Sequence, residues 1–215
     1  MQREAGRRCV RRTAPSSHPA KDIFAIFRTH IGAVNPDAFL RTLLAEDQIA
    51  ARVRDMAAKI SQDYEGKAPI LVGILKGSVF FLSDLVRRLT CDHEVDFISI
   101  SSYGDSVSTS GVVRLLKDLD KDITGRHVLV VEDIIDSGTS LEYIRRNLLS
   151  RDPESVAIAT LLDKRERREM HVPVQYVGFV IPNEFVVGYG LDYAERYRNL
   201  NYVAVLEQED LMESP

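Results

Sequence analysis

The sequence lacks the features that mark several large classes of protein. It has only two cysteines, Cys9 and Cys91, which lie far apart and in no metal-ligand spacing, so a disulfide framework and a zinc site are not expected. It has no apolar run near the roughly 20 residues needed to span a bilayer. Its 28 Lys and Arg are outnumbered by 32 Asp and Glu, so no overall positive charge attracts nucleic acid. We therefore expect a cytoplasmic protein with no membrane or nucleic-acid partner, in which any phosphate recognition is local.

Residues 1–40 differ in composition from the rest of the chain. Five arginines precede the loop-forming segment 15–19, and Glu4 is the only acid among them. The apolar core of a secretory signal does not follow at once, although the arginine-rich, acid-poor composition leaves a transit peptide open. We favour an extension that is disordered or an over-long start, and we place the functional domain at residues 41–215.

From Glu46 onward, helical and strand patterns alternate. Ile49, Val53, Met56 and Ile60 recur at helical spacing, and two further helical stripes lie within 82–89 and 141–149. Between them lie short apolar runs that read as strands, at 70–74, 95–100, 128–131 and 156–162. Such runs separated by helices indicate an α/β fold with a central, mostly parallel sheet flanked by helices.

Each predicted strand is followed by a polar or glycine-containing segment. These segments are 75–77, 101–104, 132–140 and 163–165. In parallel sheets, ligands bind at the carboxyl ends of the strands. The sequence therefore predicts that four loops meet at one crevice.

The segment after the third strand, VEDIIDSGTS (131–140), combines an acidic half with a small, hydroxyl-rich glycine turn. The turn leads into a helix, so its N–H groups could surround a phosphate, or it could be only a helix start capped by Asp136 or Ser137. It is neither a P-loop nor a GxGxxG turn. The adjacent pair Glu132 and Asp133 favours a ligand, because partly buried carboxylates need hydrogen-bond donors or a cation. Ribose hydroxyls and Mg²⁺ would each meet that need.

This segment resembles the phosphoribosyl pyrophosphate (PRPP) motif of the type I phosphoribosyltransferases, in particular their hypoxanthine-guanine branch. The resemblance extends from about Glu46 to about Leu206 and includes VGILKG, ISSYG, LLDKRERR and IPNEFVVGYGLDYAERYRNL. It implies a small hood, formed by the N- and C-terminal segments, above the sheet. It also implies a purine salvage enzyme that makes IMP or GMP and pyrophosphate from PRPP and a 6-oxopurine, with Mg²⁺ as cofactor, working as a homodimer or homotetramer.

The resemblance also implies a role for individual residues. The 5-phosphate would bind the turn formed by Ser137, Gly138, Thr139 and Ser140. The ribose hydroxyls, and a metal ion, would face Glu132 and Asp133. Asp136 would be the catalytic acid or base near purine N7.

For the base, the resemblance implies contacts from Lys164 to the 6-oxo group, from Phe185 by stacking, and from the backbone of Val186 and Asp192. Without it, Lys164 and the run Arg165–Arg168 would read as a solvated charge cluster, and we retain that interpretation for Arg165–Arg168. The segment Phe185–Val187 would otherwise read as a core strand.

For pyrophosphate, the resemblance implies Lys76, Gly77 and Arg198, with a cis peptide between Leu75 and Lys76, and it makes Asp192 a Mg²⁺ ligand. Ser102 and Tyr103 match a lid dipeptide within the polar segment 101–111, which would exclude water from the reaction.

A PRPP-sensing regulatory protein on the same fold is the alternative. Such a protein need not retain the catalytic set, which is complete here, and the arginine-rich start is too short and unpatterned for a DNA-binding domain. The sequence does not rank hypoxanthine, guanine and xanthine. Glu184 stands where relatives commonly carry a basic residue, so its effect on binding is open.

Overall fold

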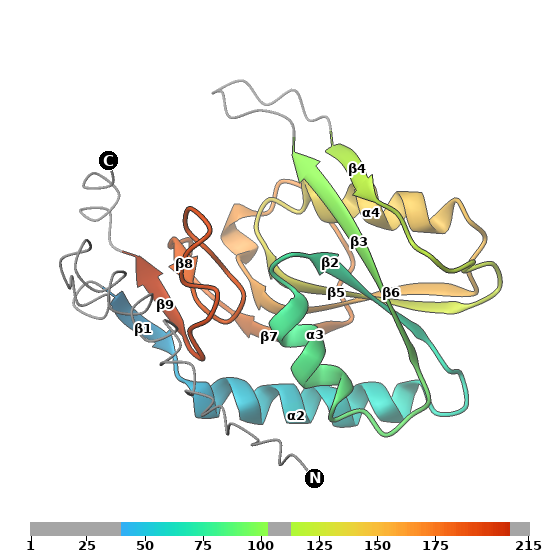
Figure 1. Cartoon of the computed structure of the whole chain (residues 1–215), viewed down its shortest axis with the longest axis horizontal. Helices are drawn as coiled ribbons and strands as arrows, with labels where there is room; N and C mark the ends of the chain where they lie inside the picture. Colours follow the sequence, from blue (N-terminus) through green and yellow to red (C-terminus); the bar gives the residue numbers. More distant parts are fainter. Residues whose placement is uncertain (1–39, 103–112, 207–215) are drawn as a thin grey trace, which may run out of the picture. The chain divides into compact units, whose positions relative to one another are not determined.

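The structure, a computed structural model, describes residues 40–102 and 113–206 (Figure 1). The helices and strands in these ranges are β1 (Leu40–Leu44), α2 (Glu46–Asp63), β2 (Ile70–Leu75), α3 (Val79–Val86), β3 (Glu94–Ser102), β4 (Val113–Lys117), β5 (His127–Ile135), α4 (Thr139–Leu149), β6 (Ser155–Asp163), a 3-10 helix (Arg165–Arg167), β7 (Tyr176–Val180), β8 (Val186–Val187) and β9 (Val203–Leu206).

The main sheet has six strands in the order β4-β3-β2-β5-β6-β7. Every pairing among β3, β2, β5, β6 and β7 is parallel, and only β4 runs antiparallel, to β3. The predicted mostly parallel sheet is therefore confirmed. The chain proceeds from β2 outward to β3 and then returns to place β5 on the other side of β2. The strand order thus reverses between β2 and β5, and ligands bind outside the carboxyl ends of strands at such a point.

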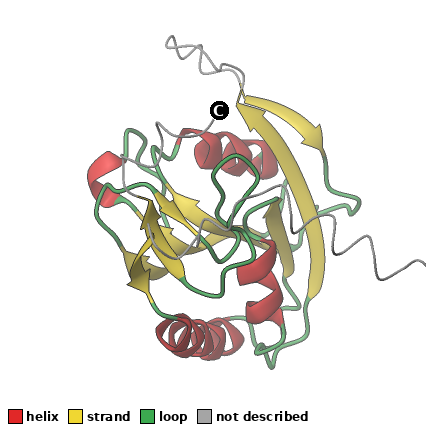
Figure 2. Ribbon diagram, turned by 60° about the vertical axis from the view of Figure 1, so that its left-hand side comes forward, coloured by secondary structure: helices red, strands yellow, loops and turns green. Residues whose placement is uncertain are grey.

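Helices cover both faces of this sheet (Figure 2). On one face, α2 and α3 pack on Leu71, Leu129 and Val131; on the other, α4 packs on Val72 and Val130. Because each central strand is buried on both faces, it forms a continuous apolar run in the sequence. In the described part of the chain, no helix has the length and apolar character that crossing a membrane requires.

The three predicted helical stripes are confirmed except at the C-terminal ends of the second and the third. Ile49, Val53, Met56 and Ile60 are all buried on α2. Leu89 was placed in the second helical stripe, but α3 ends at Val86. Leu149 is 41% exposed, so the buried stripe of α4 ends at Leu148.

A separate three-stranded antiparallel sheet, in the order β1-β9-β8, forms the hood. In this sheet β1, the first strand of the described chain, pairs with β9, the last, and Leu40 lies opposite Leu206. Strand β8 pairs with the other edge of β9, where Val186 lies opposite Val205. Arg41 on β1 also forms an ion pair of 2.8 Å with Glu184, just before β8. The acid at 184 therefore binds the hood strand β1.

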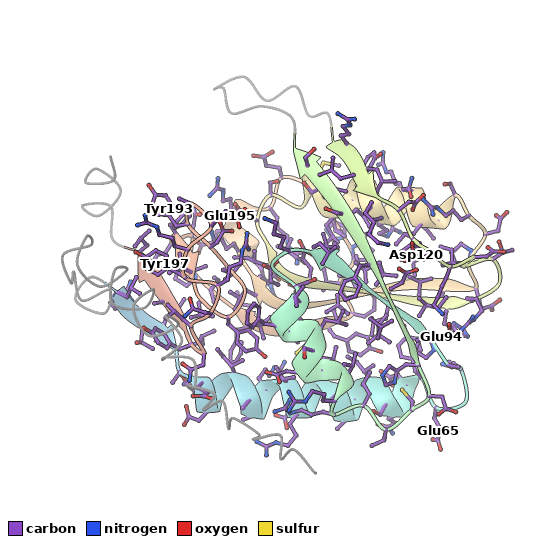
Figure 3. All side chains as sticks on the ribbon, in the orientation of Figure 1. Glu65, Glu94, Asp120, Tyr193, Glu195 and Tyr197 are labelled. Carbon is purple, nitrogen blue, oxygen red and sulfur yellow. The ribbon has the colours of Figure 1, made fainter. Side chains whose placement is uncertain are left out.

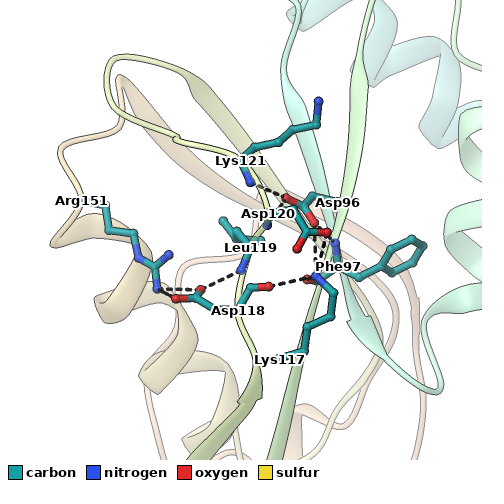
Figure 4. A network of polar contacts seen from close by, with 8 residues as sticks. All are labelled: Asp96, Phe97, Lys117, Asp118, Leu119, Asp120, Lys121 and Arg151. Atoms are coloured by element: carbon teal, nitrogen blue, oxygen red, sulfur yellow. Dashed lines mark hydrogen bonds and ion pairs between the residues drawn. The ribbon is translucent and has the colours of Figure 1, made fainter.

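A buried carboxylate fixes the base of the β3–β4 pair (Figure 4). Asp96 is 4% exposed and accepts hydrogen bonds from the backbone N–H groups of Phe97, Asp120 and Lys121, at 2.7, 2.9 and 3.1 Å. Lys117 Nζ lies 3.6 Å from the same carboxylate. These contacts satisfy a charge that would be costly to bury alone. They hold the segment after β4 against β3.

Candidate functional site

A cleft of about 560 Å³ lies at the carboxyl ends of β2, β5 and β6. It brings together most of the predicted site residues, and they come from segments far apart in the sequence. Those that line the cleft are Lys76, Gly77, Glu132, Asp133, Asp136, Ser140, Lys164, Phe185, Val186, Asp192 and Arg198. The predicted meeting of loops at one crevice is thereby confirmed for the segments after β2, β5 and β6.

The turn after β5 leaves the start of α4 open to a ligand. The N-cap of α4 is Gly138, in the left-handed region at φ 84°, and no side chain caps the helix. The N-cap residue is therefore neither Asp136 nor Ser137, the two residues that the alternative of a capped helix start named. Ser137 Oγ accepts a long hydrogen bond of 3.4 Å from Thr139 N and donates to Thr139 Oγ1 at 3.2 Å. Free N–H groups at a helix start favour an anion, and Ser140 of the same turn lines the cleft.

Glu132 and Asp133 lie beside this turn with little solvation. Glu132 Oε2 is buried and has no hydrogen-bond partner in the described structure. Burial raises the pKa of Glu132 well above its usual value, and the neighbouring charge of Asp133 raises it further. Burial also raises the pKa of Asp133 to about 6, against the lowering effect of the Ile134 N–H. Two such carboxyl groups would gain from a cation or from hydroxyl donors.

The raised pKa of Asp133 predicts how stability depends on pH in the ligand-free protein. An unfolded aspartate ionises near pH 4, whereas the folded one retains its proton up to about pH 6. The folded state binds more protons at Asp133 in this interval, so the contribution of Asp133 to stability is fully present below pH 4 and is lost as pH rises to about 6, by about 3 kcal/mol. Calorimetry should show that the Tm of the wild type, measured relative to that of Asp133→Asn, falls from about pH 4 to pH 6.5. Identical profiles for the two proteins would contradict the assignment.

The loop after β2 contacts the acidic pair directly. The Leu75–Lys76 peptide is cis, as predicted. A Cβ atom added at Gly77 would lie 1.8 Å from Asp133 Oδ2, so only glycine fits beneath this carboxylate. The backbone of the Lys76–Gly77 loop and the Asp133 side chain therefore hold each other in place.

This contact predicts that Gly77→Ala impairs activity by displacing Asp133. We expect kcat/KM to fall by about 10- to 100-fold, since a shift of about 1 Å in a site group can cost that much. Steady-state kinetics would measure the fall. Gly66→Ala is the matched control, because a Cβ there meets nothing within 4 Å, although φ is 70° at Gly66 and some stability will be lost. Equal activity losses in the two variants would contradict a specific role for the Gly77 contact.

Asp136 faces two cationic side chains across the cleft. Its Oδ1 lies 3.1 Å from Arg167 Nε and 3.9 Å from Lys164 Nζ. Neither contact is aligned as a hydrogen bond, so Oδ1 still has the capacity to accept one. Lys164 is 5% exposed, and burial lowers its pKa, while the Asp136 charge opposes that shift. An acceptor and a buried donor therefore stand side by side.

The interpretation of Arg165–Arg168 as a solvated charge cluster is wrong for Arg168 alone, because residues 165–167 are exposed whereas Arg168 is partly buried. Arg168 forms an ion pair of 2.9 Å with Asp163, which is 1% exposed, and Arg165 lies 3.3 Å from the same carboxylate. Arg167 binds Asp136 instead. No pattern in the sequence predicts this division, because it depends on which way each side chain leaves the 3-10 helix.

Phe185 and Val186 form one wall of the cleft. Val186 begins β8 and is 5% exposed, as expected of a core strand, but Phe185 is 44% exposed. The Phe185 ring meets Tyr193 edge to face, with centroids 5.8 Å apart. An exposed ring fixed in this way offers a flat surface on which a planar ligand can stack.

Arg198 and Asp192, which also line the cleft, form an ion pair. Arg198 Nη2 lies 2.8 Å from Asp192 Oδ1 and 3.4 Å from Glu195 Oε2, and Arg198 Nη1 donates to the carbonyl of Gly190. Glu195 also binds Lys76 Nζ at 2.8 Å. Glu195 and Arg167 are thus polar groups at this site that sequence reasoning missed.

Some predicted residues are not placed in the cleft. Ser137, Gly138 and Thr139 belong to the turn but are not among the residues that line the cleft. Ser102 ends β3, where its backbone pairs with Val113, and Tyr103 lies outside the described residues, as does most of the proposed lid. Of residues 1–40, only Leu40 is described.

Comparisons with known proteins agree with this geometry. Residues 41–194 match the family model described as "Phosphoribosyl transferase domain". The hypoxanthine phosphoribosyltransferase of Escherichia coli K12 is 51% identical over 166 residues, which cover 76% of this chain and 93% of the relative. The hypoxanthine-guanine phosphoribosyltransferase of Mycobacterium bovis is 45% identical over 196 residues, covering 88% and 97%. A crystal structure of a hypoxanthine phosphoribosyltransferase from Staphylococcus aureus superposes with a TM-score of 0.79 at 43% identity, covering 85% and 100%.

Proposed function

The chain belongs to the phosphoribosyltransferase family, and we propose that it transfers the 5-phosphoribosyl group of PRPP to N9 of hypoxanthine or guanine. The products are IMP or GMP and pyrophosphate, which makes it a purine salvage enzyme. One observation carries the proposal: a single cleft holds an uncapped helix start, an acidic pair short of partners, and an aspartate beside a buried lysine. The named relatives are enzymes, and nothing favours the PRPP-sensing alternative.

The substrate PRPP has groups that match one half of the cleft. Its 5-phosphate binds the N–H groups and hydroxyls of Ser137, Gly138, Thr139 and Ser140 at the start of α4. Its ribose hydroxyls donate to Glu132 and Asp133. The unpartnered Glu132 Oε2 supports this arrangement, because a hydroxyl donor satisfies it even when the carboxyl group is charged.

The purine binds the other half. It stacks on Phe185, its 6-oxo group accepts from Lys164, and its edge meets the backbone near Val186 and Asp192. As the C1–O bond to pyrophosphate breaks, the N9 lone pair forms a bond to C1 of the ribose. The proton on N7 then passes to Asp136, and the pyrophosphate leaves with the electron pair.

Pyrophosphate is held by the backbone of Lys76 and Gly77 and by Arg198. Mg²⁺, when bound, offsets the charge of the leaving group. The described residues contain no group of three His, Cys, Asp or Glu side chains placed to hold a metal. The proposed carboxylate ligands, Asp192, Glu132 and Asp133, still fit Mg²⁺, because this ion commonly binds one or two carboxylates together with substrate oxygens and water.

Four further assignments complete the proposal. Residues 41–215, together with Leu40 of β1, form the catalytic domain, and the rest of residues 1–40 is an extension outside it. Ser102 and Tyr103 cover bound PRPP and exclude water. The enzyme acts in the cytoplasm as a homodimer or homotetramer.

The proposal is tested by mixing the protein with PRPP, Mg²⁺ and each of hypoxanthine, guanine, xanthine and adenine. We expect nucleotide from hypoxanthine or guanine, together with an equal amount of pyrophosphate. Competition between the bases would rank the 6-oxopurines. If none of the three 6-oxopurines gave nucleotide, the proposal would be wrong.

A further inference from the structure

Glu195 forms ion pairs with both cationic side chains assigned to the pyrophosphate loops. Its Oε1 lies 2.8 Å from Lys76 Nζ, and its Oε2 lies 3.4 Å from Arg198 Nη2. Lys76 follows β2, whereas Arg198 lies more than a hundred residues later in the chain. The carboxylate therefore bridges the two loops where pyrophosphate is expected to bind.

The loop that carries Glu195 has an unfavourable backbone. Ala194, Glu195 and Tyr197 have φ of 50°, 62° and 74°, in the left-handed region that favours glycine. Local hydrogen bonds retain this conformation: Glu195 N donates to Asp192 Oδ2 at 2.9 Å, and Tyr193 and Arg196 exchange backbone hydrogen bonds. The loop is thus built in a specific shape at a conformational cost.

Backbone contacts also fix this loop against the one after β2. A Cβ atom added at Gly190 would lie 2.1 Å from the carbonyl oxygen of Gly77. Gly190 N donates to the carbonyl of Arg198 at 3.0 Å. The main chain, and not only the ion pairs, therefore brings Glu195 close to Lys76.

Stability does not explain such a construction. The side chains of Lys76 and Glu195 are 67% and 65% exposed, and exposed ion pairs contribute little to folding. Lys76 and Arg198 lower the pKa of Glu195, so the carboxylate remains charged near neutral pH. A carboxylate that is paired with the cations of an anion site competes with any anion that binds to those cations.

We propose that Glu195 is a resident counter-ion of the pyrophosphate site: it pairs with Lys76 and Arg198 when the site is empty and releases them when a diphosphate group binds. This role rests on the proposed function, which assigns the Lys76 loop and Arg198 to pyrophosphate. Binding then replaces one set of ion pairs by another, so the net affinity for pyrophosphate is lower than the two cations alone would give. A weaker hold on the product favours its release.

The test is the affinity of Glu195→Gln for inorganic pyrophosphate in the presence of Mg²⁺, measured by titration calorimetry. We expect the Kd to fall by about 3- to 10-fold, since each exposed ion pair that competes is weak. The KM for hypoxanthine should not change, because the Glu195 side chain is not among the groups assigned to the base. Glu195→Ala should change the Kd in the same direction.

Glu94→Gln is the matched control. Glu94 also bridges one lysine and one arginine, Lys121 and Arg126, but it lies at the other end of the domain from Glu195 (Figure 3). Its variant loses the same charge and the same kinds of ion pair, and its Kd for pyrophosphate should equal that of the wild type.

Each other result would overturn the counter-ion role. An unchanged or higher Kd in both Glu195 variants would show that Glu195 only supports the loop. An equal fall in Glu94→Gln would show a general effect of net charge. Absence of pyrophosphate binding by the wild type would reject the site assignment itself, and the nucleotide assay would then show whether the proposed function fails with it.

Discussion

Replacing Asp136 with asparagine is expected to lower kcat by about 10²–10⁴-fold, the usual contribution of a general acid or base. Asparagine fills the same space but cannot take up the N7 proton. The Kd for PRPP should change little, because the phosphate turn and the Glu132–Asp133 pair remain intact. Single-turnover kinetics would measure the chemical step, and calorimetry with PRPP and Mg²⁺ would measure binding.

The reverse pattern would contradict this division of roles. If Asp136→Asn abolished PRPP binding while bound substrate still reacted at the normal rate, Asp136 would be a binding residue. Arg165→Gln is a useful control, because it removes a charge from the neighbouring 3-10 helix without touching Asp136. It should retain near-normal turnover.

Replacing Lys164 with methionine is expected to remove most of the preference for 6-oxopurines over adenine. Lys164 is almost fully buried, so methionine retains the packing of its stem but not the donor. Losing one partner of a buried charged hydrogen bond typically costs 2–5 kcal/mol, so kcat/KM for hypoxanthine should fall by about 10²–10³-fold. Adenine, which carries an amino group at that position, should be affected far less.

The kcat/KM values with hypoxanthine and with adenine distinguish a direct contact of Lys164 with the base from an effect of Lys164 on Asp136. Lys164 Nζ also lies 3.9 Å from Asp136, so its loss could disturb the catalytic carboxylate. In that case, hypoxanthine and adenine would lose activity equally, and the ratio of their kcat/KM values would not move. Such a result would contradict the assignment of Lys164 to the 6-oxo group.

The parts of the fold that follow from local pattern were predictable. Strand β2 and the segment 128–131 of β5 are buried on both faces and so form unbroken apolar runs, whereas the acidic end of β5 was predicted to lie beyond the strand. By contrast, β4 (VRLLK) has alternating burial and one exposed face, so it leaves no such run and was missed. The two-residue strand β8 exists only because β9 pairs with it. Pairing between distant segments has no local signal.

The same distinction applies to the site. Asp136 and Lys164 could be named because each follows directly on a strand within a recognisable motif. Arg167 and Glu195 could not, because their roles depend on side-chain direction and on a left-handed loop. The buried pair of Asp163 with Arg168 was hidden within what reads as a uniformly charged run.

The hood also determines how the order of the chain's segments could be changed. Because β1 and β9 are antiparallel neighbours, with Leu40 opposite Leu206, the two ends of the described chain meet. A covalent link between them would let the chain be opened at another surface turn, as in a circular permutant. Val186, in the base-facing wall, pairs with Val205 of β9, so this wall would then be secured by a hairpin of β9 and β1 and no longer by two strands that only hydrogen bonds join.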